Sequence, residues 1–185
     1  MIPSLGQIVE GYLLIVPVQH YRALAEMPPA LFEELPGICE RVGAALASTF
    51  GPCLLFEHGA WSEVAGGCGI YHAHLHAVPF TFGEQGPLLG QLLNTFPHRR
   101  LNILADIRAN ATPSIPYLYY ECLLGERYLF YTQSLPSQYM RQLLAEALGK
   151  SEWDWRKCGK EQALLSALAR LSIHFQLKTD EKPCR

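Results

Sequence analysis

The sequence lacks three features that assign many proteins to a class. Its six cysteines include no CxxC pair, the spacing that marks many zinc and redox sites. Its formal net charge is only −2, so no overall positive field attracts nucleic acid or an anionic membrane. Its longest strongly apolar run, from Tyr12 to Val18, contains Pro17 and is far shorter than the roughly 20 residues of a membrane helix. We therefore expect no membrane segment and no nonspecific binding of nucleic acid.

Several catalytic signatures are also missing. The sequence contains no GxxxxGK(S/T) loop, no GxGxxG after a strand and no GxSxG turn, which argues against a P-loop NTPase, a dinucleotide oxidoreductase and an α/β-hydrolase. No redox cofactor is implied. The start of the chain has no basic flank followed by an apolar run, and the cysteines are scattered. These features predict free thiols and a cytoplasmic location.

The sequence does contain enough apolar residues, 49% of 185, to form one domain with a buried core. Periodicity and turn residues predict strands over 12–16, 53–56 and 70–78 and a hairpin of 117–123 and 127–132 around Gly125. Helices are predicted over 29–49, with a kink or a break at Pro36, and over 88–95, 136–148 and 161–175.

These elements predict an α+β fold in which helices pack on an antiparallel sheet. We place a catalytic domain at residues 1–132 and a C-terminal helical extension, packed on the same unit, at 133–177. The polar end of the chain, 178–185, is expected to be a flexible tail.

Three histidines alternate with apolar residues in the predicted strand 70–78. Successive side chains of a strand point to opposite faces, so His72, His74 and His76 are expected to share one face. A row of imidazoles offers a nucleophile that is largely unprotonated at neutral pH, with neighbours that bind phosphate oxygens. The glycine-rich segment 66–69 before it exposes backbone N–H groups to an anion. The pattern favours displacement at phosphorus through a phosphorus–nitrogen bond.

Simpler interpretations of these residues stay open. The histidine row can be a solvated face, or it can bind a metal with a further ligand such as His58 or Cys68, because imidazole is a common metal ligand. The basic segment 98–100 either binds phosphate or, more often, is a solvated loop. Trp153 and Trp155 either stack on a base or pack in the core, and we expect at least one of them to be core.

The segment 71–79, YHAHLHAVP, resembles the motif of the histidine-triad (HIT) superfamily. Residues 11–17 followed by His20 resemble the upstream strand of that family, which has a glycine, an apolar run, a proline and a histidine. The blocks FEHG at 56–59, PSQY at 136–139 and WDWRKC at 153–158 are similar to the CwfJ-like branch of HIT-like nucleotide hydrolases and transferases. The resemblance covers most of the chain. It implies a HIT-like sheet-and-helix fold, often dimeric, that acts at the α-phosphate of nucleotides.

The resemblance also implies roles for individual residues. His74 would attack phosphorus, while His72 and His76 would orient it and contact the phosphate. His20 is similar to a fourth histidine beside the site, and Glu57 falls near a position that often contacts phosphate.

The glycines before the triad match the family only in part. Gly67 and Gly69 fall near its backbone donors to phosphate, but Gly69 stands where many members have a Ser or Thr that assists the leaving group. Ser137, Gln138 or Gln133 could replace that hydroxyl. We expect Ser137 and Gln138 to bind phosphate, because free N–H groups at the start of a helix favour an anion. Only ten residues precede Gly11, so base recognition is expected from the C-terminal extension or a partner chain.

The sequence thus predicts an enzyme, a nucleotide hydrolase or nucleotidyl transferase that forms a nucleotidyl-histidine intermediate. Its substrate would be a nucleotide conjugate or a dinucleoside polyphosphate, and it would use no cofactor and no metal. The resemblance also allows a homodimer. One alternative is a dinucleoside polyphosphate phosphorylase, which uses phosphate as the acceptor. Another is a CwfJ-like module that binds RNA or a processing partner without catalysis. The complete set of three histidines favours the enzyme.

Overall fold

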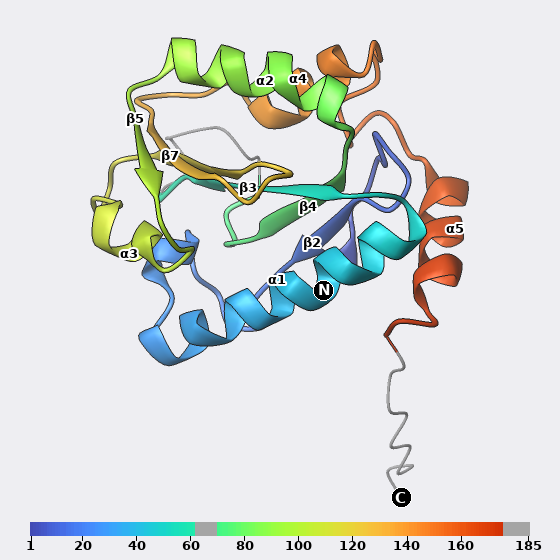
Figure 1. Ribbon diagram of the computed structural model, residues 1–185, viewed down its shortest axis with the longest axis horizontal. Helices are drawn as coiled ribbons and strands as arrows, with labels where there is room; N and C mark the ends of the chain where they lie inside the picture. The colour runs from blue at the N-terminus through green and yellow to red at the C-terminus, as the bar shows by residue number, and fades with distance from the viewer. Residues whose placement is uncertain (62–69, 176–185) are drawn as a thin grey trace, which may run out of the picture.

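An antiparallel sheet organises the residues that this computed structural model describes, which are 1–61 and 70–175 (Figure 1). Within these ranges the sheet has seven strands in the order β1-β2-β4-β3-β6-β7-β5, and every neighbouring pair is antiparallel. The strands are β1 (Ile2–Pro3), β2 (Leu13–Ile15), β3 (Cys53–Gly59), β4 (Leu75–Pro79), β5 (His98–Leu101), β6 (Tyr117–Glu121) and β7 (Arg127–Tyr131).

Helices cover both faces of this sheet. They are η1 (Leu24–Glu26), α1 (Pro29–Thr49), α2 (Phe82–Thr95), α3 (Asp106–Asn110), α4 (Tyr139–Ala147) and α5 (Glu161–Leu171). In Figure 1, α2 and α4 lie above the sheet and α1 lies below it, while α5 stands at one side and contacts α1 and β1. The predicted α+β class, an antiparallel sheet with packed helices, is therefore confirmed.

Each strand contributes alternate side chains to two apolar cores. On β4, Leu75 and Ala77 belong to the core under α1, whereas Val78 belongs to the core under α2 and α4. The period of two residues dictates this division. His76, which lies between Leu75 and Ala77, therefore points to the α4 face, and this placement positions the site.

Two helices, α1 and α2, differ from their predicted form. The helix α1 is continuous from Pro29 to Thr49 through Pro36, so the predicted break does not occur. The helix expected to start at Leu88 starts at Phe82, because Thr81 and Glu84 form a reciprocal capping box. This T-x-x-E signal is readable in the sequence.

Two predictions of local structure are wrong, one in the extent of a strand and one in the type of structure. The strand expected over 70–78 is β4, which begins only at Leu75, so His72 and His74 precede the strand. The basic segment 98–100, interpreted as a loop, forms β5, where His98 pairs with Phe130 and Leu101 with Arg127. An edge strand tolerates exposed arginines because one side of it faces solvent, and pairing with β7 decides its conformation.

Chain-wide features give two further results. None of the helices in residues 1–61 and 70–175 combines the length and apolar character of a membrane-spanning segment.

The predicted tail 178–185 lies outside the described residues. The division between residues 1–132 and 133–177 stays a prediction, although Met140 and Leu144 of α4 are part of the core on that face of the sheet.

Candidate functional site

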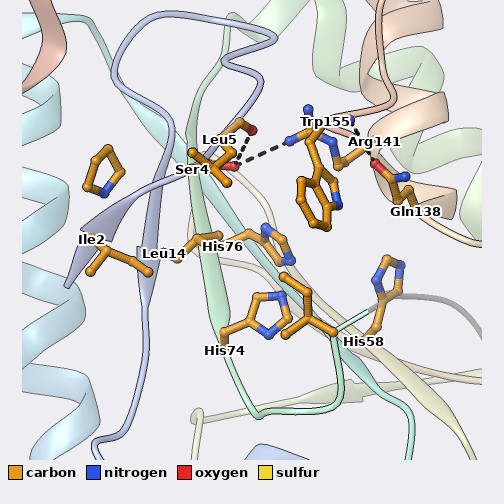
Figure 2. Close-up of a pocket in the computed structure, with 12 residues that line it drawn as sticks. Ile2, Ser4, Leu5, Leu14, His58, His74, His76, Gln138, Arg141 and Trp155 are labelled. Carbon is orange, nitrogen blue, oxygen red and sulfur yellow. Dashed lines mark hydrogen bonds between the residues drawn. The ribbon is translucent and has the colours of Figure 1, made fainter. Parts of the chain in front are cut away.

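A pocket of about 130 Å³ lies on the α4 face of the sheet. Its walls come from the N-terminal residues, from β2, β3 and β4, and from the C-terminal segment after β7. The lining residues are Ile2, Pro3, Ser4, Leu5, Leu14, His58, Ile70, His74, His76, Gln138, Arg141 and Trp155 (Figure 2). The volume is below the range of about 300–1,000 Å³ usual for drug-sized ligands, so the pocket fits one end of a nucleotide-sized molecule.

Three imidazoles converge on this pocket, those of His58, His74 and His76 (Figure 2). The ring centroids of His74 and His76 are 4.6 Å apart, and those of His58 and His76 are 6.4 Å apart. Strand register creates the cluster. Phe56 pairs with His76 across β3 and β4, and their rings stack at 4.1 Å. His58 follows Phe56 by two residues on the same face.

The protonation of His74 follows from its surroundings. Its Nδ1 lies 2.6 Å from the carbonyl oxygen of His72, and since a carbonyl only accepts, Nδ1 carries the hydrogen. Burial, the largest cause, lowers the pKa of His74 below 6.5, so the ring is neutral at pH 7. A neutral ring with hydrogen on Nδ1 has its lone pair on Nε2. The site therefore contains an imidazole in the tautomer that a nucleophile requires.

The other two imidazoles hold unpaired polar atoms. His76 Nδ1 lies 2.7 Å from the hydroxyl of Tyr12, but its Nε2 has no hydrogen-bond partner among the described residues, and neither has Nδ1 or Nε2 of His58. Burial lowers the pKa of His58 to about 3 and that of His76 well below 6.5. Buried polar groups are rarely left unpaired. These nitrogens are thus available to a ligand.

His72 lies apart from this cluster, and the expectation that three histidines line one strand face is wrong for it. Its Nε2 donates to the Pro17 carbonyl at 2.9 Å, and its ring lies edge-on to that of His20, 5.2 Å away. His20 in turn donates from Nε2 to the carbonyl of Tyr71. His20 and His72 thus form a second pair outside the pocket lining, because the chain before Leu75 does not continue the strand.

Glu57 points to the opposite face of the sheet. Its carboxylate accepts hydrogen bonds of 2.6 Å from the Leu24 N–H and from the Tyr117 hydroxyl. Burial raises the pKa of Glu57 to about 7. The carboxylate therefore fixes η1 to the sheet and does not line the histidine pocket. The predicted phosphate donors Gly67 and Gly69 lie outside the described residues.

The structure separates the two residues expected at the start of the helix after 136. Ser137 is exposed and does not line the pocket. Gln138 is buried, lines the pocket and caps α4 with a φ of 59°. Its amide is occupied, since Nε2 donates to Asp154 at 2.8 Å and Oε1 accepts from the Trp155 N–H at 3.2 Å. Gln138 thus holds the segment that carries Trp155, and its side chain already makes hydrogen bonds within the protein.

Arg141 ties the N-terminal and C-terminal segments together behind the pocket. Its Nε donates to the Trp153 carbonyl at 2.8 Å, its Nη1 to the Ser4 hydroxyl at 3.3 Å and its Nη2 to the Gly6 carbonyl. The side chain is only 4% exposed. No carboxylate among the described residues forms an ion pair with it, so the guanidinium is balanced by neutral acceptors.

Sequence reasoning named His58 only as a possible metal ligand and missed Arg141 as part of the pocket. In residues 1–61 and 70–175, no group of three or more His, Cys, Asp or Glu side chains is arranged to hold a metal ion. The alternation of FEHG could have indicated the face on which His58 lies. Only the pairing of β3 with β4 reveals that it faces the same pocket as His76.

Fold and site together define an α+β protein with a buried histidine pocket. No protein-family model matches the sequence. The chain is 25% identical over 177 residues to CWF19-like protein 1 of Mus musculus and 26% identical over 181 residues to CWF19-like protein 1 of Homo sapiens. Each comparison covers 89% of this chain and 31% of the relative, so the chain spans about a third of the length of these curated relatives. This weak homology agrees with the CwfJ-like part of the expected resemblance, and the histidine-triad relationship stays a prediction.

Proposed function

We propose that the protein is a nucleotide hydrolase or nucleotidyl transferase in which His74 forms a covalent bond to the α-phosphorus of its substrate. The observation that carries the proposal is the hydrogen bond from His74 Nδ1 to the His72 carbonyl. It fixes the neutral tautomer whose Nε2 lone pair attacks, and burial keeps the pKa of the ring low enough for that form to prevail at pH 7.

The reaction proceeds in two displacements. His74 Nε2 forms a bond to phosphorus while the bond from phosphorus to the leaving oxygen breaks, and the leaving group takes the electron pair. Positive charge that develops on the imidazole is stabilised by the His72 carbonyl, which accepts from Nδ1–H. Water or another acceptor then attacks phosphorus and returns the electron pair to Nε2. The site contributes mainly by positioning the substrate and by hydrogen bonds to it. His76 Nε2, which has no partner among the described residues, is available for such a bond, and its ring lies 4.6 Å from that of His74.

Turnover of diadenosine tetraphosphate and of nucleotide conjugates such as UDP-glucose tests this proposal. We expect His74→Asn to lower kcat/KM by at least about a thousandfold, because the nucleophile is lost. His98→Asn, at the exposed edge strand β5, is the matched control and should leave kcat/KM unchanged. Equal activity of His74→Asn and the wild-type protein would remove the proposal.

The identity of the acceptor separates hydrolysis from phosphorolysis. If water resolves the intermediate, one product is a nucleoside monophosphate whether or not inorganic phosphate is present. If the protein is a phosphorylase, added phosphate converts that product into a nucleoside diphosphate. Chromatography of the products with and without phosphate distinguishes the two reactions.

The second candidate is a CwfJ-like module that binds RNA or a processing partner without catalysis. The similarity to CWF19-like protein 1 supports it, since that relationship extends over 89% of the chain. The buried neutral tautomer of His74 favours the enzyme, because a binding surface has no need of a buried imidazole with its lone pair on Nε2. An absence of turnover with the whole substrate panel would favour the binding module.

A further inference from the structure

Trp155 forms the wall of the histidine pocket that comes from the C-terminal segment. Its indole extends toward the imidazoles of His74 and His76 (Figure 2). The side chain is half-buried, so it is shielded on part of its surface and presents the rest to the pocket. An indole in this position offers a flat apolar surface beside the proposed nucleophile.

Three sets of contacts fix the position of Trp155. The Arg156 guanidinium lies over the Trp155 ring, 5.0 Å from the ring centroid. The Gln138 side-chain amide donates to the Asp154 carboxylate and accepts from the backbone N–H of Trp155. Gly6, with a φ of +57°, packs so closely that an added Cβ would lie 2.8 Å from the Trp155 Cα. A glycine is required there because of both the conformation and the close approach. The indole is therefore a preorganised surface of the site.

The remaining walls of the pocket suit an uncharged group. Ile2, Leu14 and Ile70 supply apolar side chains, and among residues 1–61 and 70–175 no carboxylate lines the pocket. Burial lowers the pKa of both His58 and His76, so these rings are neutral. Within the described part of the chain, Arg141 is the one cationic lining residue, and it donates to Ser4, Gly6 and Trp153. The described lining is therefore mostly apolar or neutral.

Neutral His58 adds a specific polar requirement. A neutral imidazole has one N–H donor and one lone-pair acceptor, and both nitrogens of His58 lack a partner within the described part of the chain. Its side chain is only 6% exposed. A planar group that carries both a donor and an acceptor on its edge would satisfy it, and nucleobases have such edges.

We propose that this pocket binds the nucleobase of the substrate, with Trp155 as the stacking surface and His58 as the polar contact to the base edge. The phosphate would then lie beside His74, which lines the same pocket. This proposal rests on the proposed function at His74 for the identity of the ligand as a nucleotide. Gln138 is a positioning residue in it, because it acts through Trp155.

Binding of ligands that cannot react tests the proposal. Adenosine, guanosine, cytidine and uridine are titrated by calorimetry against the wild-type protein, alongside ribose 5-phosphate. At least one nucleoside should bind, and Trp155→Ala should weaken it about 5- to 150-fold, the range that base–aromatic stacking gives. Trp155→Phe should retain part of the affinity. Phe82→Ala removes an aromatic ring that is 57% exposed on α2, away from the pocket, and should have no effect.

The outcomes separate this proposal from the one it rests on. Binding of ribose 5-phosphate should be the same in the wild-type protein and Trp155→Ala, and His58→Phe should alter the preference among the four nucleosides. Failure of every nucleoside to bind, an unchanged affinity in Trp155→Ala, or an equal loss for ribose 5-phosphate would overturn the base-binding role. Because nucleosides carry no phosphate, none of these results depends on chemistry at His74, which the turnover assay tests by itself.

Discussion

The two faces of the sheet bury polar side chains in different ways. On the α1 face, Glu57 is paired with both the Leu24 N–H and the Tyr117 hydroxyl. On the α4 face, His58 is also buried but has no hydrogen-bond partner among the described residues. Adjacent residues of one strand thus serve opposite purposes. A satisfied buried group stabilises the fold, whereas an unsatisfied one in a pocket costs stability and indicates a ligand.

The largest effect on stability is expected at Glu57. Glu57→Leu leaves the Leu24 N–H and the Tyr117 hydroxyl buried without an acceptor, which should lower the free energy of unfolding by about 2–6 kcal/mol, since each unsatisfied group costs about 1–3 kcal/mol. Urea denaturation measures the change. Glu33→Leu, at an exposed position of α1, is the control and should change stability by less than about 0.5 kcal/mol. An equally small loss at Glu57 would mean that the two faces do not differ.

The pH dependence of stability should have opposite signs on the two faces. Burial raises the pKa of Glu57 from 4.5 to about 7, so the folded protein binds more protons between these values. The contribution of Glu57 is complete below pH 4.5 and is lost as the pH rises to about 7. Burial lowers the pKa of His58 from 6.5 to about 3. The contribution of His58 is complete above pH 6.5 and is lost as the pH falls toward 3.

Single variants should separate these two slopes. In the wild-type protein, Glu57 should make the free energy of unfolding fall by at most about 1.4 kcal/mol per pH unit as the pH rises from about 4.5 to 7, and Glu57→Gln should abolish this slope. His58 should make it increase by a similar amount per unit as the pH rises from about 3 to 6.5, and His58→Phe should abolish that slope. Urea titrations across this range compare both variants with the wild-type protein. Identical slopes in all three proteins would contradict the protonation states assigned to both residues.

A smaller effect is expected for His58→Phe at neutral pH. Replacing a buried, unpaired imidazole with an apolar ring of similar shape removes a desolvation cost, so stability should stay the same or rise by about 1 kcal/mol. The melting temperature in the absence of ligand measures this. A loss of more than about 2 kcal/mol would show that His58 is bonded within the fold and is not held ready for a ligand.

How far the sequence predicts the structure depends on the range of the interaction. Helix α1 follows from local periodicity. The start of α2 follows from the capping box of Thr81 and Glu84, which are three residues apart in the sequence. The third imidazole of the pocket depends instead on the register of Phe56 against His76, which no local pattern contains. Strand β5 was missed for a similar reason, since only β7 supplies its partner.

The candidate site was predicted in part. His74 and His76 were placed together by spacing alone, and Gln138 was expected at the start of a helix near them. Ser137 was expected beside Gln138 in the site, but α4 starts at Tyr139, three residues after the predicted start at 136. Gln138 caps the helix in a left-handed conformation, and Ser137 is exposed. The side chain of His74 is only 5% exposed. Its replacement should therefore affect packing as well as chemistry.

The most direct test of the central claim is to trap the covalent intermediate. The protein is mixed with diadenosine tetraphosphate or UDP-glucose, quenched at a pH that preserves phosphorus–nitrogen bonds, digested and analysed by peptide mass spectrometry. The account predicts a nucleotidyl group on the peptide that contains His74, with fragment ions that assign it to this residue, and no such group in His74→Asn. An adduct on His72 or His58, or turnover that continues in His74→Asn without any adduct, would contradict it.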